Sequence, residues 1–138
     1  MRATNRHGWL SSFAVAFLLV IHATSNAAEQ LSIEQTVSIL KQERMAGRDN
    51  TFLMNVISGA GRAYLMANAN LDLLRRPKLY CQPGKFSLDA RNYADIAVKR
   101  YEQDRLIFNA SPLAQQSPLD LLVMILLEGL QDTFPCKQ

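Results

Sequence analysis

Apolar side chains recur at helical spacing in four segments of the chain, and no segment shows the alternation that is typical of a strand. The first segment runs from Ile33 to Met45. Ser32 and Gln35 stand at its start with the spacing of a capping box, and Gly47 lies just beyond its end. These signals predict a first helix over residues 33–45.

The second segment is the longest and runs from about Thr51 to Leu74, with Asp49 or Asn50 as its expected cap. Its apolar stripe consists of Leu53, Ile57, Ala60, Tyr64, Ala67, Leu71 and Leu74. Gly59 and Gly61 interrupt the stripe at about 1 kcal/mol each relative to alanine. The alternative to one continuous helix is therefore a kink or a break at these glycines. The small residues Gly59, Ala60, Ala63 and Ala67 form a surface that another helix can approach closely.

A turn-rich connection, Lys78–Phe86, leads to a third segment that begins with Ser87 as its expected N-cap and ends near Gln103. Its apolar face consists of Tyr93, Ile96, Ala97 and Tyr101. We predict a third helix here, with Asp95 and Lys99 as an i,i+4 ion pair on its polar face.

The stretch Asp104–Gln116 shows no clean period, and Asn109, Ser111 and Pro112 interrupt any helix. We predict that it is irregular. Loops of this length in compact domains are often functional or mobile. The alternative is a partly packed connection tucked under the fold.

The last segment opens with Ser117 as N-cap and Pro118 at the first helical position. It is apolar nearly all round, at Leu119, Leu121, Leu122, Val123, Met124, Ile125, Leu126, Leu127 and Leu130. Such a helix is buried on most sides, so we expect it at the centre of the fold or in an oligomer interface. Asp120, Glu128 and its short length exclude a membrane span. The predicted fold is all-α, a small irregular bundle of about four main helices.

Residues 1–27 have the features of a signal peptide. Arg2 and Arg6 precede a short apolar run, Leu10–Ile21, and Ser25 and Ala27 have the small-x-small spacing of a cleavage site. An uncleaved anchor is the alternative. We therefore expect a cleaved signal peptide over residues 1–27, a single all-helical domain over residues 28–138, and a periplasmic location.

Removal of the signal peptide changes the composition. Two of the 15 basic residues leave and none of the 12 acidic residues, so the formal net charge falls from +3 to +1. This value gives no reason to expect nucleic acid or an anionic membrane as a partner. His7 and His22 also leave, so the mature chain has no histidine for acid–base or nucleophilic catalysis or for a zinc site.

We accordingly expect a protein that is not an enzyme, with no catalytic residues, no metal site and no cofactor. A carboxylate mechanism such as that of a glycosidase is the remaining catalytic alternative. Its best candidates are Asp89, Asp95 and Glu102 on the third helix, where a solvated helix face is the simpler explanation.

The mature chain has two cysteines, Cys81 and Cys136. Exported domains with two cysteines usually join them. We expect one disulfide that clamps the last helix onto the connection after the second helix, and two unpaired buried thiols are the alternative.

Four short motifs occur in order along the chain: Asn68-Ala69-Asn70, Leu79-Tyr80-Cys81-Gln82-Pro83, a helix with Tyr93 and Ile96, and Leu130-Gln131-Asp132-Thr133-Phe134-Pro135-Cys136. This set resembles the Rap/Tai immunity proteins of type VI secretion systems over roughly residues 50–136. The resemblance implies a periplasmic helical protein that binds and inhibits a peptidoglycan amidase effector, which protects the producing cell and its siblings. It also implies a possible homodimer.

An inhibitor needs a rigid scaffold and a projecting surface rather than catalytic groups. Apolar side chains at a loop tip are plausible anchors for a partner. We therefore expect partner-binding residues in the irregular stretch, namely Phe108, Asn109, Ser111 and Leu113. The connection Lys78–Lys85 is the second candidate surface. A small periplasmic helical chaperone or envelope-stress protein is the alternative function.

We predict that export removes the chain up to about Ala27. Intact-mass measurement of protein from the periplasm should give a species without Trp9. A mass that retains Trp9 would favour the uncleaved anchor.

Overall fold

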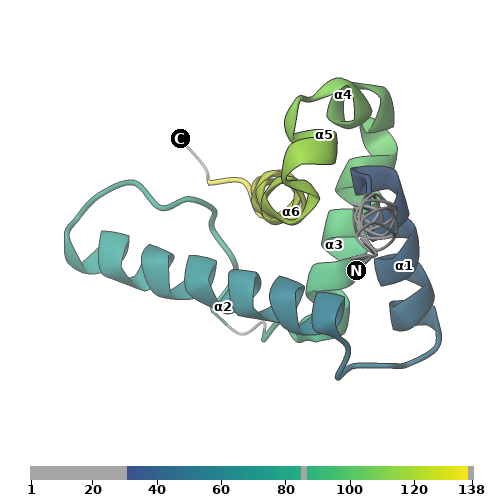
Figure 1. Ribbon diagram of the computed structural model, residues 1–138. Coiled ribbons are helices and arrows are strands. Elements are labelled where there is room, and N and C mark those ends of the chain that lie inside the picture. Colours follow the sequence, from purple (N-terminus) through teal and green to yellow (C-terminus); the bar gives the residue numbers. More distant parts are fainter. Residues whose placement is uncertain (1–30, 85–86, 137–138) are drawn as a thin grey trace, which may run out of the picture.

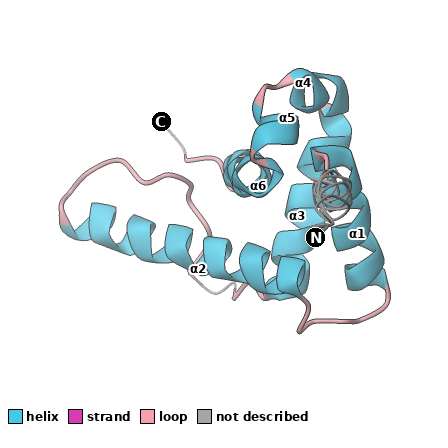
Figure 2. Cartoon of the chain, in the orientation of Figure 1, coloured by secondary structure: helices cyan, strands magenta, loops and turns pink. Residues whose placement is uncertain are grey.

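The computed structural model describes residues 31–84 and 87–136, and their regular structure is entirely helical (Figure 2). The helices are α1 (Ile33–Met45), α2 (Phe52–Leu73), α3 (Ala90–Gln103), α4 (Arg105–Ala110), α5 (Leu113–Gln116) and α6 (Pro118–Thr133). The all-α fold is confirmed. The expected signal peptide lies outside the described residues. No helix in the described part is long and apolar enough to cross a membrane.

Helix α6 occupies the centre of the bundle. It packs against α1, α2, α3 and α5, and Figure 1 shows it end-on between these helices. The side chains of Leu122, Ile125, Leu126 and Leu130 are completely buried. Because burial of apolar side chains stabilises the fold, the other helices cover most of α6, and of its large apolar residues only Met124 is exposed. The prediction that this helix belongs to the core is confirmed.

Two glycines allow helices to approach closely. A Cβ at Gly129 would lie 2.7 Å from the side chain of Ile96 and 3.0 Å from its carbonyl oxygen, so α6 and α3 nearly touch there. A Cβ at Gly61 would lie 2.5 Å from the ring of Tyr93. Helix α2 runs through Gly59 and Gly61 without a break, so one continuous helix is correct.

The first cap agrees with the prediction, and the next two differ. Ser32 and Gln35 form both bonds of a capping box at α1. Thr51 caps α2 in place of Asp49 or Asn50, because the carboxylate of Asp49 accepts two hydrogen bonds from the Arg91 guanidinium, at 2.7 and 2.8 Å.

Asp89 caps α3 in place of Ser87. Its carboxylate accepts the backbone N–H of Asn92 at 2.9 Å, and the Asn92 side chain accepts the N–H of Asp89 at 3.0 Å. Two reciprocal bonds satisfy two helix donors, which a cap at Ser87 would leave unpaired.

The prediction of an irregular stretch over Asp104–Gln116 is wrong. Two short helices, α4 and α5, occupy it. Their six and four residues are too few to show a helical period in the sequence. Phe108 and Ala114 are buried and hold both helices on the bundle.

We predict that Leu126→Asp lowers the free energy of unfolding by roughly 3–5 kcal/mol, because it places an unpaired carboxylate in a fully buried position. Met124→Asp is the matched control, since Met124 lies on the same helix and is exposed. Its effect should stay within about 0.5–1 kcal/mol. Denaturant unfolding measures both, and equal effects would contradict the central position of α6.

Candidate functional site

The described part of the chain contains no group of three His, Cys, Asp or Glu residues that could hold a metal ion. The carboxylates that sequence reasoning named for catalysis have structural partners. Asp95 pairs with Arg44 at 2.5 Å and Glu102 with Lys41 at 2.5 Å, while Asp89 is a cap. The expected pair of Asp95 with Lys99 is replaced by this contact between helices.

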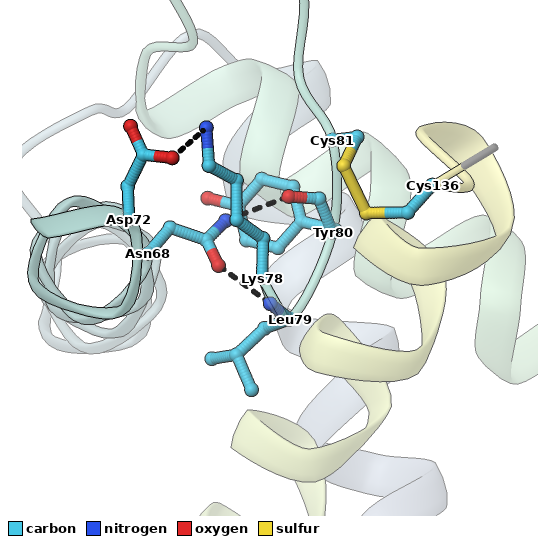
Figure 3. The surroundings of a disulfide bond; sticks show 7 residues. All are labelled: Asn68, Asp72, Lys78, Leu79, Tyr80, Cys81 and Cys136. Atoms are coloured by element: carbon cyan, nitrogen blue, oxygen red, sulfur yellow. Dashed lines mark hydrogen bonds and ion pairs between the residues drawn. A yellow bond between two sulfur atoms is a disulfide. The ribbon is translucent and has the colours of Figure 1, made fainter. Parts of the chain in front are cut away.

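The predicted disulfide between Cys81 and Cys136 is present (Figure 3). It joins the connection after α2 to the chain just beyond α6. The backbone N–H of Cys81 also donates to the carbonyl of Phe134 at 2.8 Å. The two segments are therefore held by one covalent bond and one hydrogen bond.

Asn68 fixes the same connection from the side of α2. Its buried side-chain amide donates to the carbonyl of Tyr80 at 2.9 Å and accepts the N–H of Leu79 at 2.7 Å. Figure 3 shows these bonds beside the ion pair of Lys78 with Asp72, which spans 3.0 Å. The chain that returns from α2 is thus tied to the helix it has just left.

The Cys81–Cys136 disulfide, the Asn68 hydrogen bonds and the hydrogen bond from Cys81 to Phe134 together form a clamp on the connection after α2. Tyr80, within this connection, is a buried core residue. Its ring is 6.5 Å from that of Phe134, between centroids. Burial, followed by the neighbouring Tyr93, raises the pKa of Tyr80 to about 12. Its hydroxyl has no hydrogen-bond partner among the described residues. The side chain therefore stays neutral and serves packing.

The four expected partner-binding residues lie together on α4, α5 and the turn between them, where Phe108 is buried and the other three are partly exposed. Phe108 is only 6% exposed and stacks on Tyr101, with 6.3 Å between ring centroids. The Tyr101 hydroxyl donates to Asn109 at 2.7 Å. Ser111 accepts the N–H of Leu113, whose side chain is partly buried against the core. The expectation that Phe108 is exposed is therefore wrong.

The exposed large apolar side chains of α4 are those of Leu106 and Ile107, which are 85% and 68% exposed. The partner-binding residues expected from the sequence include Phe108 and not Leu106 or Ile107, because the stretch shows no clean helical period. Phe108 turns inward because the burial of its large aromatic ring contributes more to stability than its exposure to water would. Only the helical conformation of α4 separates inward from outward positions here.

Arg100 of α3 contacts α4 through the ring of Phe108. Its guanidinium pairs with Asp104, with Glu128 at 3.0 Å and with Asp132 at 3.3 Å, and it lies 5.4 Å from the centre of the Phe108 ring. The hydrogen bond to Asp104 keeps the pKa of Arg100 above its usual range. Arg100 therefore holds α4 against α3, and two of its carboxylate partners lie on α6.

An apolar groove of about 590 Å³ lies where the start of α2 meets α1 and the start of α6. Its wall includes Phe52, Pro118 and Leu119. Its two charged lining residues, Glu43 and Asp120, are both acidic. The groove therefore combines an apolar wall with negative charge.

Comparisons with known protein families, with curated proteins and with solved structures find no match to this chain.

We predict that non-reducing peptide mapping recovers one linked pair, Cys81 with Cys136. The bond closes a loop with a sequence separation of 55. Its removal by reduction, or by Cys81→Ser with Cys136→Ser, should lower the free energy of unfolding by about 4 kcal/mol. Two thiols that react in the native, unreduced protein would refute the bond.

Proposed function

We propose that this protein is a periplasmic immunity protein. In this role it binds a peptidoglycan amidase effector of a type VI secretion system and inhibits it. The producing cell and its siblings are thereby protected from the toxin.

Residues from three of the four motifs that resemble the Rap/Tai proteins lie far apart in the sequence but meet in the clamp. Asn68 binds the backbone of Leu79 and Tyr80, Cys81 is joined to Cys136, and the ring of Phe134 contacts Tyr80. A shared structural unit is a physical reason for such motifs to occur together. The disulfide also fits an oxidising compartment such as the periplasm.

The observation that carries the proposal is the exposure of Leu106 and Ile107 on a firmly held helix. Large apolar side chains that extend into water, supported by a buried layer, are suited to fill pockets on a partner. The stacking of Phe108 and the ion pairs of Arg100 hold α4 in place before binding. A pre-ordered surface loses less conformational entropy on association.

The first test is biological. Co-expression with a periplasm-directed toxin encoded beside this gene should rescue growth, and the purified proteins should form a complex that lacks amidase activity. The absence of both rescue and binding would remove the immunity role. Protection of client proteins at low pH without a dedicated partner would favour the chaperone alternative.

The second test addresses the surface. We predict that Leu106→Ala and Ile107→Ala each weaken amidase binding by about 1–3 kcal/mol with little change in melting temperature. Met45→Ala is the matched control, because Met45 is 71% exposed at the end of α1. Calorimetry measures the affinities. Unchanged affinity in both α4 variants would place the contact elsewhere.

A further inference from the structure

The outer end of α2 carries large apolar side chains that the described part of the chain leaves uncovered. Met66 and Leu73 are 70% and 84% exposed. They are about two helical turns apart and therefore lie on the same side of the helix. Leu74, just past the helix, is 62% exposed, and Leu65, at the edge of this side, is 46% exposed. These four residues form an apolar strip.

Three arginines border the apolar strip. Arg62 lies one helical turn before Met66, and Arg75 and Arg76 follow the end of α2. All three are exposed, and none forms an ion pair within the described residues. Their guanidinium groups are therefore open to an anionic partner.

The formal charge of this segment differs from that of the mature chain. Residues 62–78 contain four basic residues and one acidic residue, which gives +3, whereas the mature chain carries +1. The acidic residue, Asp72, pairs with Lys78 at 3.0 Å. The low net charge of the chain therefore hides a local cationic surface at the outer end of α2.

The clamp holds this end of α2 from the opposite side. Asn68 is two positions from Met66, which places it about 200° round the helix, and it binds the backbone of Leu79 and Tyr80. Figure 1 shows the outer half of α2 extending past the bundle. The apolar strip thus lies on a fixed, projecting helix, so little order is lost when it binds.

An arginine occupies a position at the end of α2 where glycine is the usual residue. The N–H of Arg76 donates to the carbonyl of Leu71 at 2.8 Å, and the N–H of Arg75 donates to that of Asp72 at 3.0 Å, which are the two bonds of a Schellman motif. Arg75 has a φ of 52°, in the left-handed region that glycine adopts without strain. Because glycine would serve this helix end better, the fold alone does not account for the guanidinium group here.

We propose that the outer end of α2 is a docking surface for anionic phospholipid membranes, in which the apolar strip lies among the acyl chains and the three arginines bind lipid phosphates. Apolar side chains bordered by cations are typical of helices that lie in a membrane interface. The guanidinium group matches the geometry of phosphate oxygens. A fluid lipid surface also accepts projecting side chains without a preformed pocket. The surface shares no residue with α4, so the proposal does not depend on amidase binding.

The first test is cosedimentation of the mature chain with phospholipid vesicles. Wild-type protein should bind vesicles of equal parts phosphatidylglycerol and phosphatidylcholine, and it should bind pure phosphatidylcholine vesicles much more weakly. Binding should weaken as salt is added. Glycerol phosphate in solution, at the concentration of the lipid headgroups, should not displace the protein, because a free phosphate offers nothing to the apolar strip.

The apolar contact is tested with two methionines of equal exposure. Met66→Ser should weaken binding to the mixed vesicles about tenfold. Met45→Ser is the matched control, because Met45 is 71% exposed at the end of α1, and it should bind as wild type does.

Insertion into lipid is tested by fluorescence. The mature chain has no tryptophan, so Leu73→Trp introduces a single emitter into the strip. Its emission should move to shorter wavelength when mixed vesicles are added, whereas the emission of Met45→Trp should not move.

The cationic contact is tested with two arginines that are both exposed and unpaired within the described residues. Arg76→Gln should weaken binding about fivefold. Arg48→Gln removes the same charge before the start of α2 and should have no effect. Arg75→Gly should also weaken binding about fivefold without lowering the melting temperature, because glycine adopts the left-handed conformation readily. A residue that served only the helix end would show the opposite pattern, with unchanged binding.

Five results would overturn the proposal. They are a wild type that does not bind the mixed vesicles, equal binding to neutral vesicles, displacement by glycerol phosphate, equal effects within either matched pair, and unchanged binding of Arg75→Gly. A wild type that ignores the vesicles would leave an acidic protein as the occupant of this surface. None of these results bears on amidase binding, which is measured separately.

Discussion

The need to cover α6 constrains the whole molecule. A helix that is apolar on nearly every side must be surrounded, and a chain of this size has few helices with which to do so. Gly129 lets α3 reach the backbone of α6, and Tyr64 of α2 donates a hydrogen bond from its hydroxyl to the carbonyl of Val123 at 3.0 Å. Helices α1 and α5 close the remaining sides. The bundle is irregular because short and long helices share one centre.

The clamp holds the outer half of α2, which is the half that ends at Leu73. This half extends past the bundle in Figure 1 and has little core of its own. Asn68 satisfies two backbone groups of the returning chain, and replacing its amide with an apolar group would leave both groups unpaired. The disulfide then joins that chain to the end of α6. Order at the far end of α2 thus depends on contacts that are local to α2 and on one bond to the core.

The surface proposed on α4 consists of side chains that these structural requirements leave exposed. Side chains with polar groups are largely used in caps and in ion pairs between helices, such as Arg44 with Asp95. Exposed ion pairs of this kind contribute little to stability, but they engage the charged groups of these side chains in contacts between helices. Leu106 and Ile107 on α4 are exposed apolar side chains that take part in none of these caps and ion pairs.

Local rules in the sequence determined the helices that are long or strongly capped. The capping box of Ser32 and Gln35 predicted the start of α1, and the apolar positions of α6 predicted its burial. Both signals are local, because capping and periodicity depend on residues within one or two helical turns. The pairing of two cysteines followed from their number and from the expected export. The small-residue surface of α2 was also visible in the sequence, although not the fact that this chain leaves Gly59 and Ala63 open.

Tertiary structure decided the rest. Asp49 does not cap α2, because its carboxylate binds Arg91, which is distant in the sequence. Asp95 forms its ion pair with Arg44 of another helix instead of with the neighbouring Lys99. Phe108 is buried because it packs against Tyr101 and Arg100. This contact stabilises helical structure in a stretch for which the sequence predicted a loop. Such outcomes depend on which side chains from remote segments arrive at the same place. No local pattern in the sequence contains that information, since the energy of each contact exists only after the chain has folded.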